Sequence, residues 1–238
     1  MKTLTWFEGL RNLTTDDSST ASPRDGADAA SDGCPRCAKA RAICICDRVQ
    51  AIDTKLRVVI LQHPQEDDVT LGTAKLVTLT LPKAQIRVGL SWASLDHALG
   101  TKNADKSRWA VLAAAKLPAE LPESAKGQAV VLVDRNGAVL DAQRHRLDGV
   151  IVLDGTWSQA KTLWWRNAWL LKLPRIVLTP REPSMYGRLR KEPRRDYVST
   201  LEAIADVLPA LGESEEVRDN LRRLLRTMLQ RLRDMNLA

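Results

Sequence analysis

The chain has 238 residues, 44% of them hydrophobic and 27% charged, which is enough for one α/β domain with a buried core and small additions. The net charge of +7 is uneven: residues 1–33 hold three basic and six acidic side chains, a net −3, so the remainder carries +10. A basic folded part favours a polyanionic partner, although charge alone does not separate RNA from DNA or from simple solubility. No apolar run approaches the length of a membrane span and the first short apolar stretch is broken by Glu8, so we expect a cytoplasmic protein without a signal peptide or membrane contact.

The chain begins with a stretch that is predicted to be a disordered tail, residues 1–33. Residues 8–33 are rich in Asp, Ser, Thr, Ala and Gly and show no periodicity. Such a composition cannot bury enough apolar surface to offset the entropy of ordering the chain.

All four cysteines lie in the next segment, residues 34–47, with the spacing C-x₂-C-x₆-C-x-C. In a cytoplasmic protein this cluster favours a metal site over disulfides. Four thiolates without histidine suit a structural tetrahedral zinc ion, and an iron–sulfur cluster or a set of redox thiols is the alternative. Lys39 and Arg41 lie in the same loop and could contact phosphate. The predicted metal ligands are Cys34, Cys37, Cys44 and Cys46.

Short apolar strands then alternate with helical segments over residues 48–212, which we expect to form the main α/β domain. Arg57–Gln62 is a predicted strand that ends in His63-Pro64, and Thr73–Leu81 is a predicted helix stopped by Pro82. This alternation predicts an α/β fold with a mainly parallel sheet and flanking helices. The sequence has no G-x-G-x-x-G after the first strand and no G-x-x-x-x-G-K-[ST], which argues against ordinary dinucleotide binding and P-loop chemistry. The other predicted strands are Ile86–Leu90, Trp109–Ala114, Ala129–Val133, Val150–Leu153 and Arg175–Leu178.

The most informative stretch follows the strand Val150–Leu153. Asp154 ends the strand, Gly155 permits a sharp turn, and Thr156 caps a helix that begins at Trp157. In open α/β sheets this turn lies at the carboxyl end of a strand, where ligands usually bind, and the first N–H groups of the helix can hold an anionic group. A purely structural turn with a core tryptophan is the alternative interpretation of these residues.

A basic segment follows the last predicted strand. Residues 181–195 carry six basic and two acidic side chains and one tyrosine. Arginines for phosphate and an aromatic ring for stacking predict an RNA-binding strip, and a solvated surface loop is the alternative. The predicted RNA contacts are Arg181, Tyr186, Arg188, Arg190, Lys191, Arg194 and Arg195.

Two helices are predicted at the end of the chain. Ser199-Thr-Leu-Glu202 is a capping box that begins a helix interrupted by Pro209. Within residues 213–238, Glu213–Asn236 reads as an amphipathic helix that packs on the domain, with dimerisation as the minor alternative and a monomer favoured. Its apolar stripe comprises Val217, Leu221, Leu224, Leu225, Met228, Leu229 and Leu232.

Asp154-Gly-Thr-Trp157 resembles the Asp-x-Thr-Trp signature of the DTW-domain family, whose members are uridine aminocarboxypropyltransferases acting on tRNA, with a more distant relative acting on ribosomal RNA. The resemblance covers roughly residues 34–210. Where related chains have Asn-Thr-Ala, this chain has Gly72-Thr73-Ala74, so an amide is missing. Arg188 and Arg190 compete for the position of the family's arginine. The other matching elements are the two cysteine pairs, His63-Pro64, Ser184, Tyr186, Pro193 and Ser199–Ala203.

The resemblance implies a SPOUT-like fold with a knotted C-terminal part that binds S-adenosylmethionine. It also implies transfer of the 3-amino-3-carboxypropyl group of that donor to the position-3 nitrogen of a uridine in tRNA, with release of methylthioadenosine. We assign Asp154 as the base or the orienting group, Trp157 as a wall of the donor pocket, and Thr156 with the helix N-terminus as the site for the donor's carboxylate. Two alternatives stay open: a SPOUT-like RNA methyltransferase using the same donor, and a non-catalytic zinc-bearing RNA-binding protein. The predicted donor contacts are Asp154, Gly155, Thr156, Trp157, Thr179, Ser184, His63 and Thr73.

Overall fold

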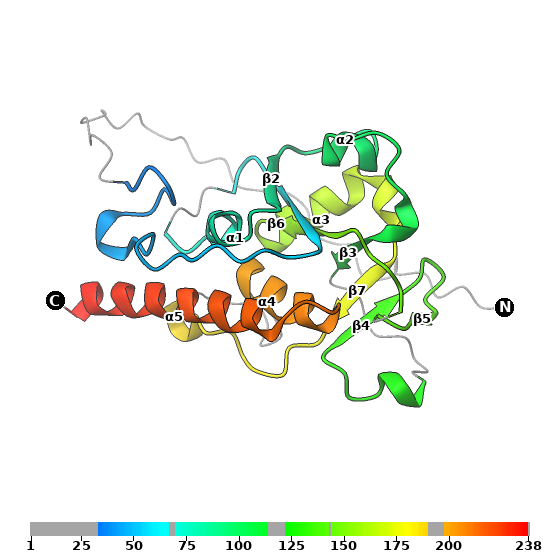
Figure 1. Ribbon diagram of the computed structural model, residues 1–238. Coiled ribbons are helices and arrows are strands. Elements are labelled where there is room, and N and C mark those ends of the chain that lie inside the picture. The colour runs from blue at the N-terminus through cyan, green and yellow to red at the C-terminus, as the bar shows by residue number, and fades with distance from the viewer. Residues whose placement is uncertain (1–32, 67–69, 114–121, 143, 190–197, 238) are drawn as a thin grey trace, which may run out of the picture. The chain divides into compact units, whose positions relative to one another are not determined.

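One seven-stranded sheet organises the computed structural model, which describes residues 33–66, 70–113, 122–142, 144–189 and 198–237 (Figure 1). The strand order is β2-β1-β6-β3-β7-β4-β5. The strands from β2 to β7 in this order run parallel, whereas β4 pairs antiparallel with both β7 and β5. The prediction of a mainly parallel α/β sheet is therefore confirmed. The strands are β1 (Arg57–Gln62), β2 (Ala84–Val88), β3 (Trp109–Ala113), β4 (Val130–Val133), β5 (Val139–Leu140), β6 (Gly149–Asp154) and β7 (Arg175–Leu178).

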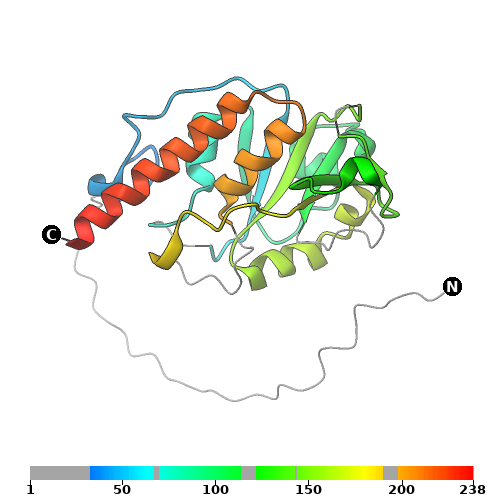
Figure 2. The same ribbon diagram turned by 90° about the horizontal axis from the view of Figure 1, so that it is seen from below.

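Helices cover both faces of this sheet. On one face, α1, α4 and α5 share a buried cluster with the strands, and on the other face α2, α3 and η4 do so. Figures 1 and 2 show α5 lying alongside α4. The α-helices are α1 (Ala74–Thr80), α2 (Leu95–Leu99), α3 (Trp157–Arg166), α4 (Thr200–Ala210) and α5 (Glu215–Leu237), and the 3-10 helices are η1 (Arg41–Ile43), η2 (Lys106–Arg108), η3 (Glu123–Ala125), η4 (Ala168–Lys172) and η5 (Gly187–Leu189).

The central strands are apolar throughout because both of their faces are covered. In β1, Val58 and Ile60 point into the cluster with α1, α4 and α5, whereas Val59 and Leu61 point into the cluster with α2 and α3. All four are at most 1% exposed. Burying such a side chain stabilises the fold by roughly 1.5–3 kcal/mol, so this unbroken apolar run strongly favours a central position.

The predicted strand boundaries hold closely for the buried strands and less well elsewhere. Arg57–Gln62 and Arg175–Leu178 are strands as predicted, and Val150–Leu153 lies inside β6. The prediction Ile86–Leu90 is displaced, because β2 begins at Ala84 and ends at Val88. This edge strand is only partly buried, so its sequence has no continuous apolar run whose ends would show where the strand begins and ends. The strand β5 and the helix α2 were not predicted; both are short.

The end of the chain packs on the sheet. Pro209 does not interrupt α4 but lies in its last turn, and Gly212, with φ of 95°, follows as the chain leaves the helix. A left-handed residue at this place is the usual end of a helix. The apolar stripe of α5 is buried from Val217 to Leu229 in the same cluster as α1 and α4, and Leu232 is half-buried.

The described residues from Gly33 onward form one compact unit, so the cysteine segment and α5 are parts of the same body as the sheet. The predicted tail, apart from Gly33, lies outside the described residues. No helix in the described ranges has both the length and the apolar character needed to cross a bilayer.

Candidate active site

Asp154 ends β6 at the carboxyl edge of the parallel strands and is 8% exposed. Side chains from two other elements hold its carboxylate. Gln62 Nε2, at the end of β1, donates to one oxygen at 2.7 Å, and the Thr200 hydroxyl, at the start of α4, donates to the other at 2.5 Å. The register of the sheet pairs Gln62 with Asp154 directly. Because a carboxylate has about four acceptor positions, Asp154 is oriented and can still accept a proton or bind a cationic group.

The turn after Asp154 has the predicted form of a capped helix. Gly155 has φ of +146°, and an added Cβ there would lie 2.8 Å from the Gln159 side chain, so other residues would be strained. Thr156 and Gln159 make the reciprocal capping box of α3. Gln159 also donates from Nε2 to the carbonyl of Gln65 at 3.0 Å, which ties this turn to the loop after β1. Trp157 is 46% exposed, so it lies partly at the surface, close in sequence to Asp154, and is not a core side chain.

His63 lies next to this turn and is 7% exposed. Its backbone N–H donates to the carbonyl of Asp154 at 3.0 Å, and its Nδ1 accepts from the backbone N–H of Gln65 at 3.1 Å. An accepting Nδ1 assigns the proton of the neutral ring to Nε2. The structure therefore places His63 next to Asp154, with Nε2–H as its remaining donor.

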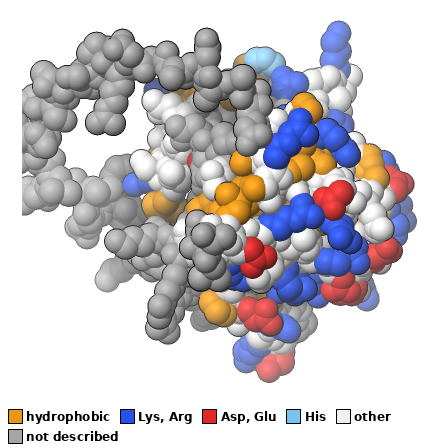
Figure 3. All heavy atoms as spheres, turned by 90° about the vertical axis from the view of Figure 1, so that its left-hand side faces the viewer, with side chains coloured by type: hydrophobic (Ala, Val, Ile, Leu, Met, Phe, Trp, Pro, Cys, Tyr) orange, Lys and Arg blue, Asp and Glu red, His pale blue; other side chains and the backbone are white. Residues whose placement is uncertain are grey.

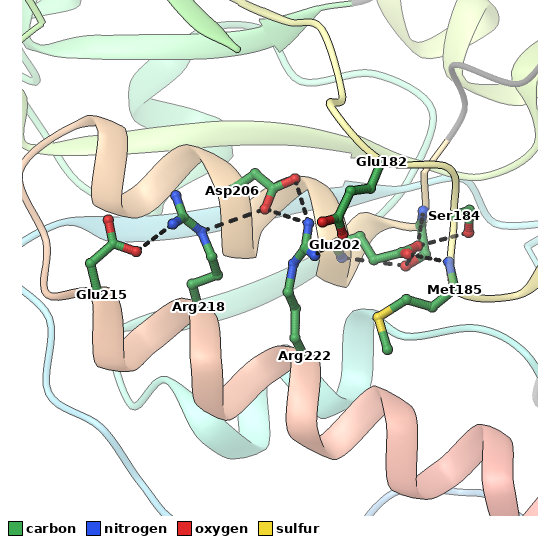
Figure 4. Close-up of polar contacts among 9 residues, drawn as sticks. Glu182, Ser184, Met185, Glu202, Asp206, Glu215, Arg218 and Arg222 are labelled. Carbon is green, nitrogen blue, oxygen red and sulfur yellow. Dashed lines mark hydrogen bonds and ion pairs between the residues drawn. The ribbon is translucent and has the colours of Figure 1, made fainter. Parts of the chain in front are cut away.

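The first turn of α4 collects two more predicted donor contacts. The Thr73 hydroxyl accepts from the backbone N–H of Leu201 at 3.2 Å. The Ser184 hydroxyl and the Met185 backbone N–H donate to the Glu202 carboxylate at 3.0 and 2.7 Å (Figure 4). Thr73 is buried and Ser184 is half-buried, so both hydroxyls already take part in holding segments together around α4.

Two arginines of α5 form ion pairs with α4 and with the segment that contains Glu182 (Figure 4). Arg222 donates to Asp206 of α4 at 2.9 Å and pairs with Glu182 at 3.0 Å, and Arg218 bridges Asp206 and Glu215. Burial opposes the charge of Arg222, but the carboxylates of Asp206 and Glu182 outweigh it and raise the pKa of the guanidinium. The segment from Glu182 to Met185 is thus fastened to both α4 and α5.

Thr179 and Arg181 lie elsewhere, at the end of β7. Thr179 is exposed, and its backbone N–H donates to the carbonyl of Ala129 at 2.7 Å. The Arg181 guanidinium donates to the carbonyl of Gly127 at 3.2 Å. Since β3 separates β7 from β6, these two side chains share the carboxyl side of the sheet with Asp154 without joining its hydrogen-bonded group.

The predicted RNA strip is only partly described. Arg190, Lys191, Arg194 and Arg195 lie outside the described residues, and of Arg188 only the backbone, in η5, is described. Tyr186 is 1% exposed, and its hydroxyl donates to the carbonyl of Leu71 at 2.5 Å. The prediction that its ring stacks on an RNA base does not hold in this structure, because the ring is part of the core.

The four cysteines converge at the other end of α5. All four Sγ atoms lie within 4.8 Å of one another, and the pairs Cys34–Cys46 and Cys37–Cys44 are 3.7 Å apart. A tetrahedron with Zn–S bonds of about 2.3 Å has edges of about 3.8 Å, so this donor set fits a zinc ion. Ala38, with φ of 61°, provides the tight turn between the two halves.

The thiols of this cluster differ in acidity. Hydrogen bonds from the backbone N–H groups of Cys37 and Arg36 lower the pKa of the Cys34 thiol to about 6. Burial raises the pKa of Cys44 and of Cys46 above the ordinary thiol value. A bound cation would stabilise all four as thiolates, which is the usual way such sites lose their protons.

Lys39 joins the cysteine segment to the rest of the site. It is 1% exposed, and its ammonium donates to the carbonyls of Thr70 at 2.9 Å and Gly72 at 2.7 Å. The expectation that Lys39 contacts phosphate is therefore wrong, because its charge is buried among carbonyls of the loop before α1. Arg41, in contrast, is exposed as that expectation requires.

Basic side chains gather on the face formed by the cysteine segment and the C-terminal end of α5. Figure 3 shows many Lys and Arg side chains around a strip of apolar ones on this side. Exposed arginines here include Arg36 and Arg41 from the cysteine segment and Arg226 and Arg233 from α5, which packs against η1. Exposed basic side chains are thus not confined to the segment that the sequence singled out, and acidic side chains lie among them (Figure 3).

Three side chains of the site were missed from the sequence. Gln62 and Thr200 hold Asp154, and Glu202 holds the Ser184 segment. Glu202 was interpreted as a helix cap and, together with Thr200, as part of the Ser199–Ala203 match to the family, without a role at the site. Gln62 directly precedes His63-Pro64, so a polar residue at the end of an otherwise apolar strand was the available signal.

These observations define a class of protein: an α/β protein with a mainly parallel sheet, a polar site at the carboxyl edge of that sheet and a cluster of four cysteines. The DTW domain model matches residues 31–233, most of the chain, and the chain belongs to this family. No solved structure matches it significantly.

Curated relatives resemble the chain at modest identity. It is 28% identical over 200 residues to tRNA-uridine aminocarboxypropyltransferase 2 of Macaca fascicularis, and 26% identical over 205 residues to the protein of that name from Mus musculus. Each match covers 82% of this chain and 61% of the relative, so the chain spans about three fifths of these proteins. It is also 28% identical over 221 residues to tRNA-uridine aminocarboxypropyltransferase A of Arabidopsis thaliana, covering 83% of this chain and 79% of that one.

Proposed function

We propose that this protein transfers the 3-amino-3-carboxypropyl group of S-adenosylmethionine to N3 of a uridine in tRNA. The observation that carries the proposal is the Asp154 carboxylate, held by Gln62 and Thr200 beside the exposed Trp157 in the signature of the family. The names of the relatives agree with this activity.

The chemistry needs a base and an oriented donor. As the proton leaves N3 of the uridine for the Asp154 carboxylate, N3 forms a bond to the γ-carbon of the donor's methionine part. The bond from that carbon to sulfur breaks, the electron pair stays on sulfur, and methylthioadenosine leaves. The positive sulfonium already makes the carbon electrophilic, so the protein must mainly position the reactants and accept the proton.

The residues of the turn suit the donor's amino-acid part. The N–H groups at the start of α3, with Thr156, would receive its carboxylate, because a helix N-terminus favours negative charge. Trp157 would form a wall of the donor pocket, and Gly155 allows close approach of a ligand to the backbone. His63, Thr73, Thr179 and Ser184 complete the proposed donor contacts.

The finer description of the protein follows from the same proposal. The fold would be SPOUT-like with a knotted C-terminal part, which is supported by β6 entering the sheet between the earlier strands β1 and β3. Residues 34–47 would form a zinc knuckle, 48–212 the catalytic domain and 213–238 a packed C-terminal helix, after a tail of residues 1–33. We place the protein in the cytoplasm as a monomer.

RNA would bind through the basic surface, including Arg181, Arg188 and Arg190 with Lys191, Arg194 and Arg195. The single-stranded loops of tRNA offer an unstacked uridine, which such a reaction needs. The exposed arginines of the cysteine segment and of α5 support a polyanionic partner on that side.

The products distinguish this function from the two alternatives. Incubation with S-adenosylmethionine and tRNA should release methylthioadenosine, whereas a methyltransferase would release S-adenosylhomocysteine. A non-catalytic RNA-binding protein would show no thermal shift with the donor. Mass spectrometry of tRNA nucleosides from a strain lacking the protein should show loss of the aminocarboxypropyl uridine, and an unchanged nucleoside profile would contradict the proposal.

A further inference from the structure

A pocket lies at the edge of the sheet where the parallel strands begin, opposite the edge that carries Asp154. It has a volume of about 440 Å³, within the usual range of ligand pockets. Apolar residues and Trp109 form part of its wall, and four charged residues line it: Lys55, Arg57, Lys83 and Asp148.

Two of these charges are already neutralised. Lys83 pairs with Asp53 at 3.1 Å and donates to the carbonyl of Thr54, and Asp148 pairs with Arg108. Lys55 and the Arg57 guanidinium have neither an ion pair nor a hydrogen bond within the parts of the chain that the structure describes. The pocket thus carries two uncompensated positive charges.

The sheet holds Arg57 in a defined position. Arg57, Gly149 and Trp109 are the first residues of β1, β6 and β3, and the register places them in one row across the sheet. The Trp109 ring extends over Gly149, where an added Cβ would lie 2.6 Å from the ring, and the Arg57 guanidinium sits 5.5 Å from its centroid. Such a cation–π contact holds the guanidinium against the ring and leaves N–H groups that can bind an oxyanion.

We propose that this pocket binds a phosphate group, and that the group belongs to the backbone of the RNA substrate, an assignment that rests on the proposed function. An arginine held against an aromatic ring, with a lysine in the same pocket, is suited to phosphate, and the apolar wall admits a ribose or base. The strand from Arg57 to Gln62 is only about 17 Å long at 3.3 Å per residue, a separation that a tRNA lying along the surface of the domain would span. The pocket would fix the orientation of the tRNA from the side away from Asp154.

The test removes two positive charges from the pocket and, in a separate control variant, two positive charges from exposed positions outside it. Full-length protein is compared with Lys55→Gln/Arg57→Gln and with the control Arg135→Gln/Lys172→Gln, whose residues are exposed and without ion pairs in the described ranges. Binding of an unmodified tRNA transcript is measured by fluorescence anisotropy over a series of salt concentrations. Binding of S-adenosylmethionine and of inorganic pyrophosphate is measured by calorimetry.

The pocket variant should lose tRNA affinity by roughly tenfold per contact at 0.1 M salt, with the salt slope reduced by about 0.9 for each phosphate released. Donor affinity should be unchanged, and the control should bind tRNA nearly as wild type. Equal losses in the two variants would overturn the proposal. Pyrophosphate that binds the wild type, fails to bind the pocket variant and competes with tRNA supports it, whereas pyrophosphate that binds in the pocket without displacing tRNA overturns the RNA assignment. If the wild type binds donor but no tRNA, the proposed function fails, and pyrophosphate alone then decides whether the pocket binds phosphate.

Discussion

Replacing Asp154 by Asn removes the negative charge at the centre of the site while keeping the size of the side chain. Two donors face the carboxylate, Gln62 Nε2 and the Thr200 hydroxyl. An Asn carbonyl can accept from Gln62, and its amide can donate to Thr200, because a hydroxyl is both donor and acceptor. Both contacts survive as neutral hydrogen bonds, so the fold should be kept, with a free energy of unfolding lower by about 2 kcal/mol.

The effect on function depends on what Asp154 does. If it accepts the uridine proton, the affinity for S-adenosylmethionine should change little and turnover should fall about 10²-fold or more, the usual effect of losing a general base. If it anchors the ammonium of the donor, donor affinity should fall by roughly 1.5–3 kcal/mol, which is the size of a charge-assisted hydrogen bond. We expect the first outcome.

Calorimetry with the donor alone and single-turnover kinetics with tRNA separate these outcomes. Asp134→Asn is a matched control, since Asp134 accepts backbone N–H groups from Asn136 and Ala138 in the turn after β4. It should leave donor affinity and turnover unchanged. If Asp154→Asn also left both unchanged, Asp154 would merely shape the turn and the catalytic interpretation of this stretch would be wrong.

Three further changes test the remaining parts of the site. Cys37→Ser should lower the zinc content and the melting temperature together, since a structural site uses all four thiolates, and elemental analysis that finds no zinc in the wild type, or an iron signal with visible absorbance, would contradict the zinc assignment. Arg188→Ala with Arg190→Ala should weaken tRNA binding and flatten its salt dependence with donor affinity nearly intact, and the reverse pattern would place these arginines in the donor pocket. Lys39→Met should keep the zinc but leave the carbonyls of Thr70 and Gly72 without this donor; because both residues are at least partly exposed, the expected cost is only about 1 kcal/mol for each lost hydrogen bond. Faster amide exchange in residues 70–73 and weaker donor binding should follow, and an unchanged exchange rate would show that Lys39 does not order this loop.

Many of the strands and helices were predictable because buried strands require continuous apolar runs and helix starts require local capping residues. The runs Arg57–Gln62 and Val150–Leu153 are apolar without interruption, as strands covered on both faces must be. The capping boxes at Thr156 and Ser199 act between residues three apart and need no tertiary information. The direction of β4 was not predictable, because a short apolar run looks the same in parallel and antiparallel pairs.

The contacts that orient Asp154 could not be predicted from the sequence, for a different reason. Gln62 lies 92 positions before Asp154 and Thr200 lies 46 positions after it, so only the register of β1 and β6 and the packing of α4 bring them together. For Tyr186 the neighbouring residues in the sequence led to a wrong prediction. Its basic neighbours in the sequence suggested an exposed ring, whereas packing places the ring in the core against the loop before α1.

The first turn of α4 explains how segments far apart in the chain make one site. Thr200 holds Asp154, the backbone N–H of Leu201 is bound by Thr73, and Glu202 binds Ser184 and Met185. Tyr186 and Lys39 hold the loop that leads to Thr73, so the cysteine segment is connected to the same turn through one buried ammonium. A helix end offers several donors and acceptors within a few ångströms, and each contact here satisfies a group that burial would otherwise leave costly. Lys39 of the cysteine segment thus helps to hold the loop before α1, and Thr73 at the end of that loop contacts the same turn of α4 that holds Asp154.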